Sequence, residues 1–179
     1  MIEVEVKVEL RDRGEFQLRL LNLGALKLSV ERQNDIYFKH PVIDFRATDE
    51  ALRLRRAGGE VYLTYKGPKM MSGSKTREEL NLKFNDFDTA RRIFEKLKFQ
   101  PLAEIVKTRI TYQLDDIKIY MDDVEELGCY AEFEILVKDN MEVETAERRI
   151  FSLIERLGFK PSHSITNSYL ELMLKKRSD

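Results

Sequence analysis

The chain has 179 residues, which is enough for one domain with a substantial core, and we expect a single domain over residues 1–179. Its 31 Lys and Arg nearly balance 32 Asp and Glu, so a net charge of −1 draws it neither to nucleic acid nor to a membrane surface. The single cysteine, Cys129, excludes an intrachain disulfide framework. The acidic, alternating N-terminus resembles neither a signal peptide nor a transmembrane run, so we expect a cytoplasmic protein.

Charged residues are more frequent than usual, at 35% against roughly 25% in soluble domains. Balanced charge of this kind fits the ion-pair networks of a thermophile, and it equally fits charges gathered inside a polar cavity. Composition does not separate the two. The sequence contains no cluster of Cys and His, so any metal should be a hard, oxygen-ligated ion such as Mg²⁺ or Mn²⁺.

The first expected strand, at residues 3–9, alternates charged and apolar residues. Because alternate side chains of a strand share a face, Glu3, Glu5 and Lys7 point the same way. Two carboxylates and an ammonium on one face suit a divalent metal together with a polyanion. An amphipathic edge strand with its charged face in water is the alternative.

Apolar residues at helical spacing predict three helices, at about residues 12–23, 86–97 and 143–157. The second should begin at Asp86 as its N-cap and bury Ala90, Ile93, Phe94 and Leu97. Nearly everything else alternates with period two and predicts strands, with a long hairpin loop at residues 67–75.

The polar faces of these strands carry charges in pairs at positions i and i+2. The clearest pairs are Arg53 with Arg55, Lys107 with Arg109, and Glu132 with Glu134. Like charges on one strand repel unless a counter-ion or a neighbouring strand compensates them. A closed antiparallel barrel that collected these faces inside would be a charged tunnel, and the three amphipathic helices could cover its apolar exterior. A sheet with a solvated polar face is the alternative.

Such a tunnel would suit phosphate chemistry. Carboxylates from several strands could hold Mg²⁺, while Arg and Lys could clamp a triphosphate. Metal and cations together would offset the charge that develops during phosphoryl or nucleotidyl transfer. The sequence has no P-loop, Rossmann glycine pattern or nucleophile elbow, so a phosphate site would be built from side chains.

Several segments carry a resemblance to a known family. Glu3-Val4-Glu5-Val6-Lys7 resembles the ExExK signature of the CYTH superfamily, the triphosphate tunnel metalloenzymes, which include class IV adenylyl cyclases and thiamine triphosphatases. Further matching segments follow in chain order over nearly the whole sequence, at residues 35–38, 48–55, 65–68, 75–79, 107–109, 122–124, 127–128 and 132–134.

The resemblance implies an α+β fold: a closed, eight-stranded antiparallel β-barrel, the triphosphate tunnel, with amphipathic helices packed outside. It implies a metal-binding side made of Glu3, Glu5, Asp122, Glu132 and Glu134, where Glu79 either ligates metal or orients Arg77. It implies a phosphate-binding side made of Lys7, Arg53, Arg55, Lys66, Lys75, Arg77, Lys107 and Arg109. Of these, Lys7, Arg53 and Arg55 are the expected catalytic residues, and the cofactor is Mg²⁺ or Mn²⁺. For any single pair, an ion pair inside the tunnel is the alternative.

Residues 33–38 and 168–172 are most similar to class IV cyclases, in which the ribose 3′-oxygen of ATP attacks the α-phosphorus and pyrophosphate leaves. The same tunnel could instead hydrolyse inorganic tripolyphosphate, thiamine triphosphate or a nucleoside triphosphate. A non-catalytic module that binds nucleotide or polyphosphate is the third hypothesis. The expected partner is thus a small triphosphate, with neither membrane nor nucleic acid expected, and a homodimer is compatible with this view.

Overall fold

The computed structural model describes residues 2–69 and 77–178. Within them the chain forms an α+β fold with nine strands, four α-helices and two short 3₁₀ turns. In chain order the elements are β1 (Ile2–Glu9), α1 (Arg13–Asn22), β2 (Leu26–Lys39), β3 (Ala51–Ala57), β4 (Glu60–Lys69), β5 (Arg77–Phe84), α2 (Phe87–Lys96), β6 (Gln100–Leu114), β7 (Ile117–Val124), β8 (Gly128–Val137), η1 (Asn140–Glu142), α3 (Val143–Arg156), η2 (Pro161–His163), β9 (Ser164–Ile165) and α4 (Tyr169–Lys176).

The strands form one large antiparallel sheet in the order β5-β4-β3-β2-β6-β7-β8-β1-β9. The expected closed barrel of eight strands is not what the hydrogen bonds show. Over the described residues the sheet has nine strands and two ends, β5 and β9. The additional strand, β9, lies along β1, where Ile165 pairs with Lys7 and Ser164 pairs with Val8.

The chain divides into two compact units. Unit 1 comprises Met1–Glu31 and Thr108–Asn167, and unit 2 comprises Arg32–Lys107 and Ser168–Asp179. Each unit has its own apolar cluster and its own helices, so each is described by itself.

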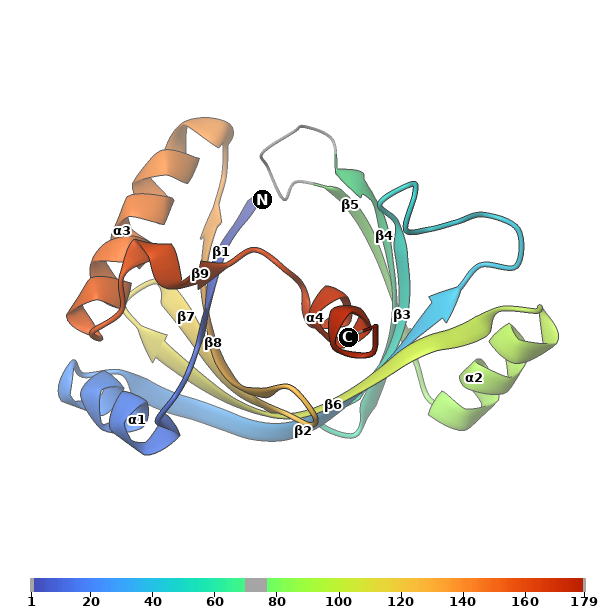
Figure 1. Cartoon of the computed structure of the whole chain (residues 1–179), viewed down its shortest axis with the longest axis horizontal. Helices are drawn as coiled ribbons and strands as arrows, with labels where there is room; N and C mark the ends of the chain where they lie inside the picture. Colours follow the sequence, from blue (N-terminus) through green and yellow to red (C-terminus); the bar gives the residue numbers. More distant parts are fainter. Residues whose placement is uncertain (1, 70–76, 179) are drawn as a thin grey trace. The chain divides into compact units, whose positions relative to one another are not determined.

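In unit 1, helices α1 and α3 supply the apolar side chains that cover the sheet (Figure 1). Asp12 begins α1 as its N-cap, because its side chain accepts a hydrogen bond of 2.8 Å from the Glu15 amide. Phe16 on α1 is buried and meets Phe133 of β8 edge-on, with ring centroids 6.3 Å apart. The helix predicted at about residues 143–157 is present as α3, and its apolar residues at helical spacing are all buried: Ala146, Ile150, Leu153, Ile154 and Leu157.

In unit 2, helix α2 packs against the apolar side of the sheet. Asp86 is its N-cap, as the sequence predicts, and accepts hydrogen bonds from the Asp88 and Thr89 amides. The prediction that Ile93 and Leu97 are buried is wrong, because they remain 51% and 58% exposed. The line of contact runs instead through Phe87, Ala90 and Phe94, at i, i+3 and i+7, which turns Ile93 and Leu97 to one side.

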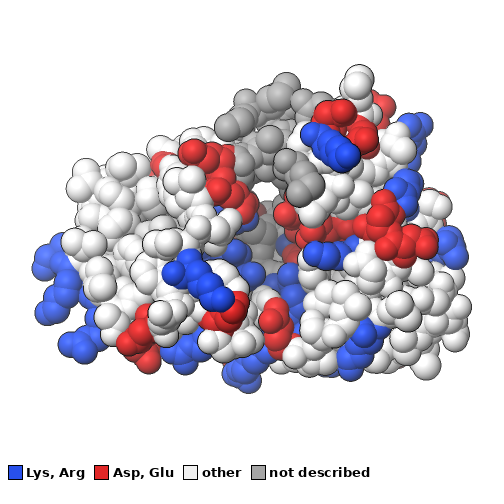
Figure 2. Space-filling view, turned by 180° about the vertical axis from the view of Figure 1, so that it is seen from behind, with Lys and Arg blue, Asp and Glu red and all other residues white. Residues whose placement is uncertain are grey.

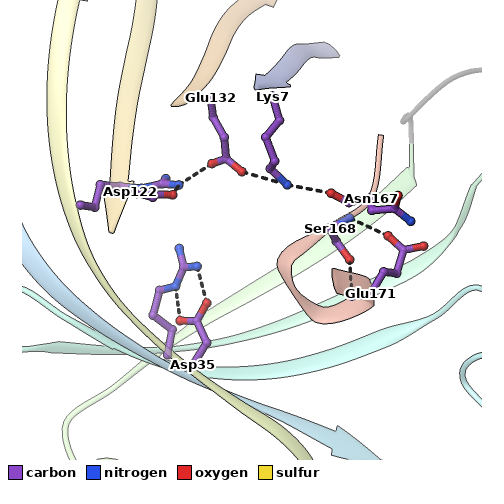
Figure 3. Close-up of polar contacts among 9 residues, drawn as sticks. Lys7, Asp35, Asp122, Glu132, Asn167, Ser168 and Glu171 are labelled. Atoms are coloured by element: carbon purple, nitrogen blue, oxygen red, sulfur yellow. Dashed lines mark hydrogen bonds and ion pairs between the residues drawn. The ribbon is translucent and has the colours of Figure 1, made fainter. Parts of the chain in front are cut away.

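Helix α4, also in unit 2, is not among the three helices predicted from the sequence. It begins with a capping box. The Ser168 side chain accepts from the Glu171 amide at 3.2 Å, and the Glu171 carboxylate accepts from the Ser168 amide at 2.6 Å (Figure 3). Tyr169 is buried, and its ring lies 4.7 Å from Lys107 Nζ of β6. The helix therefore begins on the polar side of β6.

Basic and acidic side chains are interspersed on the face that Figure 2 presents, as expected from the balanced charge of the chain. In the described ranges, 2–69 and 77–178, none of the helices is long and apolar enough to cross a membrane.

Candidate functional site

In unit 1, the pairing of β1 with β8 aligns four of the predicted site residues. Lys7 lies opposite Glu132, and Glu5 lies opposite Glu134. Residues directly opposite each other on antiparallel strands point to the same side of the sheet. The carboxylates of Glu5 and Glu134 therefore share that side with the oppositely charged pair of Lys7 and Glu132.

A network of ion pairs connects this side of unit 1, as Figure 3 shows. Lys7 Nζ lies 3.3 Å from Glu132 Oε1 and donates to the carbonyl of Asn167 at 2.9 Å. Arg109 donates to both oxygens of Asp122, at 2.7 and 2.6 Å, and also to Glu132. Lys7, Asp122 and Glu132 are buried. Buried charges of opposite sign are retained together because each compensates the desolvation of the others.

Tyr120 on β7 joins this network. Its hydroxyl donates to Glu134 Oε2 at 3.0 Å, and the Arg109 guanidinium carbon lies 4.1 Å from its ring centroid. Burial, and next the charge of Glu134, raise the pKa of the Tyr120 hydroxyl above its ordinary value. Tyr120 therefore keeps its proton at neutral pH and orients both Glu134 and Arg109.

The carboxylates on this side of unit 1 suit a hard cation that takes only a few of its ligands from the protein. No three carboxylate, imidazole or thiol groups of residues 2–69 and 77–178 cluster closely enough to make a complete protein cage. Asp122 and Glu132 are engaged by Arg109 and Lys7, and Glu5 lies opposite Glu134, which accepts a hydrogen bond from Tyr120. Mg²⁺ commonly takes only one or two carboxylates and completes its shell with water and substrate phosphates. Glu5 and Glu134 suit that arrangement.

In unit 2, a buried fork joins β2 to β3. Arg55 donates from Nε and Nη2 to the two oxygens of Asp35, each at 2.6 Å, from directly opposite on the neighbouring strand (Figure 3). Burial by itself raises the pKa of Asp35, but the hydrogen bond and charge of Arg55, with Arg53 and Lys107, outweigh it and lower that pKa below 3.8. Asp35 is therefore ionised at neutral pH and fixes the plane of the guanidinium.

Arg53, two residues before Arg55, points to the same side of the sheet. Its Nη2 donates to Thr64 Oγ1 at 3.3 Å, and Thr64 donates in turn to Asn81 at 2.7 Å. Its Nε is buried without a hydrogen-bond partner in the part of the chain that the structure describes. A buried guanidinium N–H without an acceptor is uncommon, and an anionic oxygen is the partner that would satisfy it.

The other predicted residues of unit 2 are placed as follows. Lys107 is buried beside Tyr169. Lys66 pairs with Glu79 at 2.7 Å, from directly opposite strand positions, in a half-exposed ion pair. Lys75 lies outside the described residues, as does the side chain of Arg77, whose backbone begins β5.

Sequence reasoning assigned no site role to Asp35, Thr64 or Tyr120, which the structure places in contact with predicted site residues. A signal was present, because each lies on the charged face of an alternating strand. Contact with a particular arginine or glutamate depends on strand register, which the alternation does not specify.

Comparison with known proteins places the chain in a family. The model of the CYTH domain matches residues 1–169, so the chain belongs to the CYTH family.

Similar proteins share nearly the full length. The chain is 41% identical over 172 residues to the Methanocaldococcus jannaschii protein named "Putative adenylate cyclase MJ0240", covering 96% of this chain and 98% of that one. It is 26% identical to the adenylate cyclase CyaB of Aeromonas hydrophila, over 95% of this chain and 87% of that protein. Among solved structures, the PH1819 protein of Pyrococcus horikoshii aligns with a TM-score of 0.84 at 38% identity, over 98% of this chain and 99% of that one.

Proposed function

We propose that the protein is a divalent-metal-dependent enzyme that acts on triphosphate substrates, and that it converts ATP to cyclic AMP and pyrophosphate as a class IV adenylyl cyclase does. The observation that carries this proposal is the buried Nε of Arg53, which lacks an acceptor within the described residues. Membership of the CYTH family and the name of the relative at 41% identity support the same activity.

The residues of the chain would divide the work by their chemistry. Arg53 and Arg55 present planar guanidinium groups, which suit the paired oxygens of a phosphate, and Asp35 holds Arg55 in place. Lys7 is a compact cation held by Glu132, and Arg109 is a forked cation held by Asp122. Because these partners fix the cations before substrate arrives, little reorganisation is needed when negative charge develops on the leaving phosphates.

Glu5 and Glu134 would hold the metal, with Glu3 two residues along the same strand. When bound, a divalent cation supplies charge stabilisation at phosphate oxygens. In the cyclase reaction the bond from the 3′-oxygen to the α-phosphorus forms, the bond from that phosphorus to the bridging oxygen of pyrophosphate breaks, and the proton of the 3′-hydroxyl is released together with pyrophosphate. Tyr120 acts through Glu134, whose carboxylate it orients.

The test is product analysis with ATP and inorganic tripolyphosphate supplied separately, each with Mg²⁺ or Mn²⁺. Cyclic AMP with pyrophosphate is the expected result from ATP. Orthophosphate without cyclic AMP would instead make the protein a triphosphatase. Binding of tripolyphosphate without turnover of either compound would contradict an enzymatic role and identify a binding module.

A charge-reversing variant tests the metal side. Glu134→Lys should abolish metal-dependent turnover, whereas Glu147→Lys makes the same change on an exposed residue of α3 and should leave turnover intact. Unchanged activity in folded Glu134→Lys would exclude Glu134 from the site.

A second variant tests the phosphate side. Arg55→Ala should weaken triphosphate binding more than monophosphate binding, because a longer polyanion offers more oxygens to the guanidinium groups of Arg53 and Arg55 together. Arg91→Ala, on the exposed face of α2, is the matched control. An equal loss for the two ligands would argue against a triphosphate clamp.

A further inference from the structure

A basic cavity lies beside the C-terminal end of α2, and none of the residues predicted for the active site lines it. Its volume is about 210 Å³, and it is lined by Lys39, His40, Pro41, Lys98 and Gln100, all within unit 2. The lining includes two lysines and no carboxylate. Over residues 2–69 and 77–178 neither lysine side chain forms an ion pair or a hydrogen bond, so both ammonium groups are available to a ligand.

The backbone of Lys98 adopts a conformation that favours glycine. Helices α1, α2 and α3 end in the same turn: the first amide after the C-cap donates to the carbonyl three residues back, and the next amide donates to the carbonyl five residues back. In α1 and α3 the residue after the C-cap is Gly24 or Gly158, with φ of 89° and 91°. In α2 it is Lys98, with φ of 72°. A lysine in this position carries a steric cost that glycine avoids.

Stabilisation of the helix end does not explain this lysine. A cation near a helix C-terminus interacts favourably with the helix dipole, but α1 and α3 would gain equally from one and have glycine instead. Helix α2 also has a cation in its last turn already, Lys96. What distinguishes Lys98 is that its side chain lines the cavity together with Lys39. A strained backbone position often marks a residue whose side chain serves a binding site.

His40 adds a hydrogen-bond donor to the cavity. Its Nδ1 accepts from the amides of Val42 and Ile43, at 3.1 and 2.8 Å, so the neutral ring carries its proton on Nε2. The rings of Phe45 and Phe99 have centroids 5.3 and 5.1 Å from that of the imidazole, and they restrict its rotation. The imidazole therefore presents an N–H donor in a fixed orientation.

We propose that this cavity binds a small phosphate anion, inorganic phosphate or pyrophosphate, through residues other than those of the proposed active site. The two ammonium groups, the imidazole N–H and the amide of Gln100 are donors suited to its oxygens. The cavity is too small for a nucleotide, since sites for drug-sized ligands occupy about 300–1,000 Å³. The site is a property of unit 2 and does not depend on which reaction the enzyme catalyses.

One acid acts electrostatically on this site. Glu50 lies within electrostatic reach of His40, but it does not line the cavity. Its carboxylate accepts hydrogen bonds from the hydroxyls of Thr48 and Tyr65. Glu50 is thus held by groups other than the two lysines, which leaves the lysines to the anion.

NMR of the two histidines of the chain, His40 and His163, tests the site directly. In the isotope-labelled full chain at fixed pH, pyrophosphate should shift the imidazole signals of His40 along a saturating curve. Half of the shift should be reached below about 1 mM. His163, which lies in unit 1, reports any change of pH and should not shift. Potassium chloride at equal ionic strength should move neither histidine. His40 signals that do not move by about 10 mM pyrophosphate would overturn the proposal.

Variants assign the shift to the two lysines. Lys98→Asn removes the charge but keeps a residue that tolerates positive φ. Combined with Lys39→Gln, it should raise the half-saturating concentration about tenfold or more. Lys96→Gln removes a charge two residues away and should leave that concentration unchanged. An undiminished response in the folded double variant, or an equal loss in Lys96→Gln, would refute the site.

Lys98→Gly separates strain from binding. Glycine relieves the backbone cost, so the variant should melt about 2–4 °C above the wild type while binding pyrophosphate more weakly. Wild-type affinity in Lys98→Gly would exclude Lys98 from the site.

AMP distinguishes a free anion from the phosphate group of a nucleotide. Its nucleoside exceeds the cavity, so AMP should shift the His40 signals less than inorganic phosphate at the same concentration. An equal response to the two compounds would overturn the assignment to a free anion.

Discussion

The ion pair between Asp35 and Arg55 predicts how much the free energy of unfolding falls when Arg55 is removed, and how that loss depends on pH. Arg55→Ala leaves the Asp35 carboxylate buried, since the aspartate side chain is 4% exposed and its partner 18%. Removing one member of a buried ion pair costs about 3–5 kcal/mol, because the remaining charge loses its compensation. We expect the free energy of unfolding to fall by about 3 kcal/mol at pH 7. Arg91→Ala breaks an exposed pair one turn apart on α2 and should cost about 0.5 kcal/mol or less.

The sign of the pH dependence follows from the direction of the Asp35 pKa. In the wild type that pKa lies below 3.8, so the contribution of Asp35 is fully present above 3.8 and is lost as pH falls through the folded-state value. In Arg55→Ala the chief remaining influence is burial, which raises the pKa. The variant should therefore lose stability as pH rises through its folded-state value. The difference between the two proteins should widen from pH 3 to pH 7.

Urea unfolding at pH 3 and pH 7 measures both effects, and a double-mutant cycle with Asp35→Asn isolates the pair. In the Asp35→Asn background, Arg55→Ala should cost much less, because no buried carboxylate is left behind. The reasoning would be refuted by a loss of stability that is equal at the two pH values, or by one that persists in full in the Asp35→Asn background.

Three further changes probe the packing, the site and a cap. Phe133→Ala removes a fully buried ring of the unit 1 core and should lower the free energy of unfolding by about 3–5 kcal/mol in urea, and a loss under 1 kcal/mol would show that the core is not packed there. Tyr120→Phe keeps the ring but removes the hydroxyl that orients Glu134, so it should lower kcat and weaken metal activation with stability little changed. An unaltered metal dependence would contradict that role. Ser168→Ala removes half of the box with Glu171 and should cost about 1 kcal/mol, seen as faster amide hydrogen exchange at the start of α4, whereas unchanged exchange would mean that the cap is not needed.

The sequence alone determined much of the fold, because local periodicity is a property of the chain itself. The apolar faces of α1 and α3 and the Asp86 cap of α2 follow directly from residue spacing. Alternation likewise identified the charged faces of the strands but left open whether they face solvent, and the structure shows that Lys7, Lys107, Asp122 and Glu132 are buried. The ordered motifs pointed to the CYTH family, and the family model confirms it.

Tertiary structure decided what depends on strand register and on the length of neighbouring strands. Tyr120 meets Glu134, and Arg55 meets Asp35, only because particular residues of neighbouring strands lie side by side, which alternation leaves open. The sheet has a ninth strand because β9, too short to recognise by period, pairs with β1.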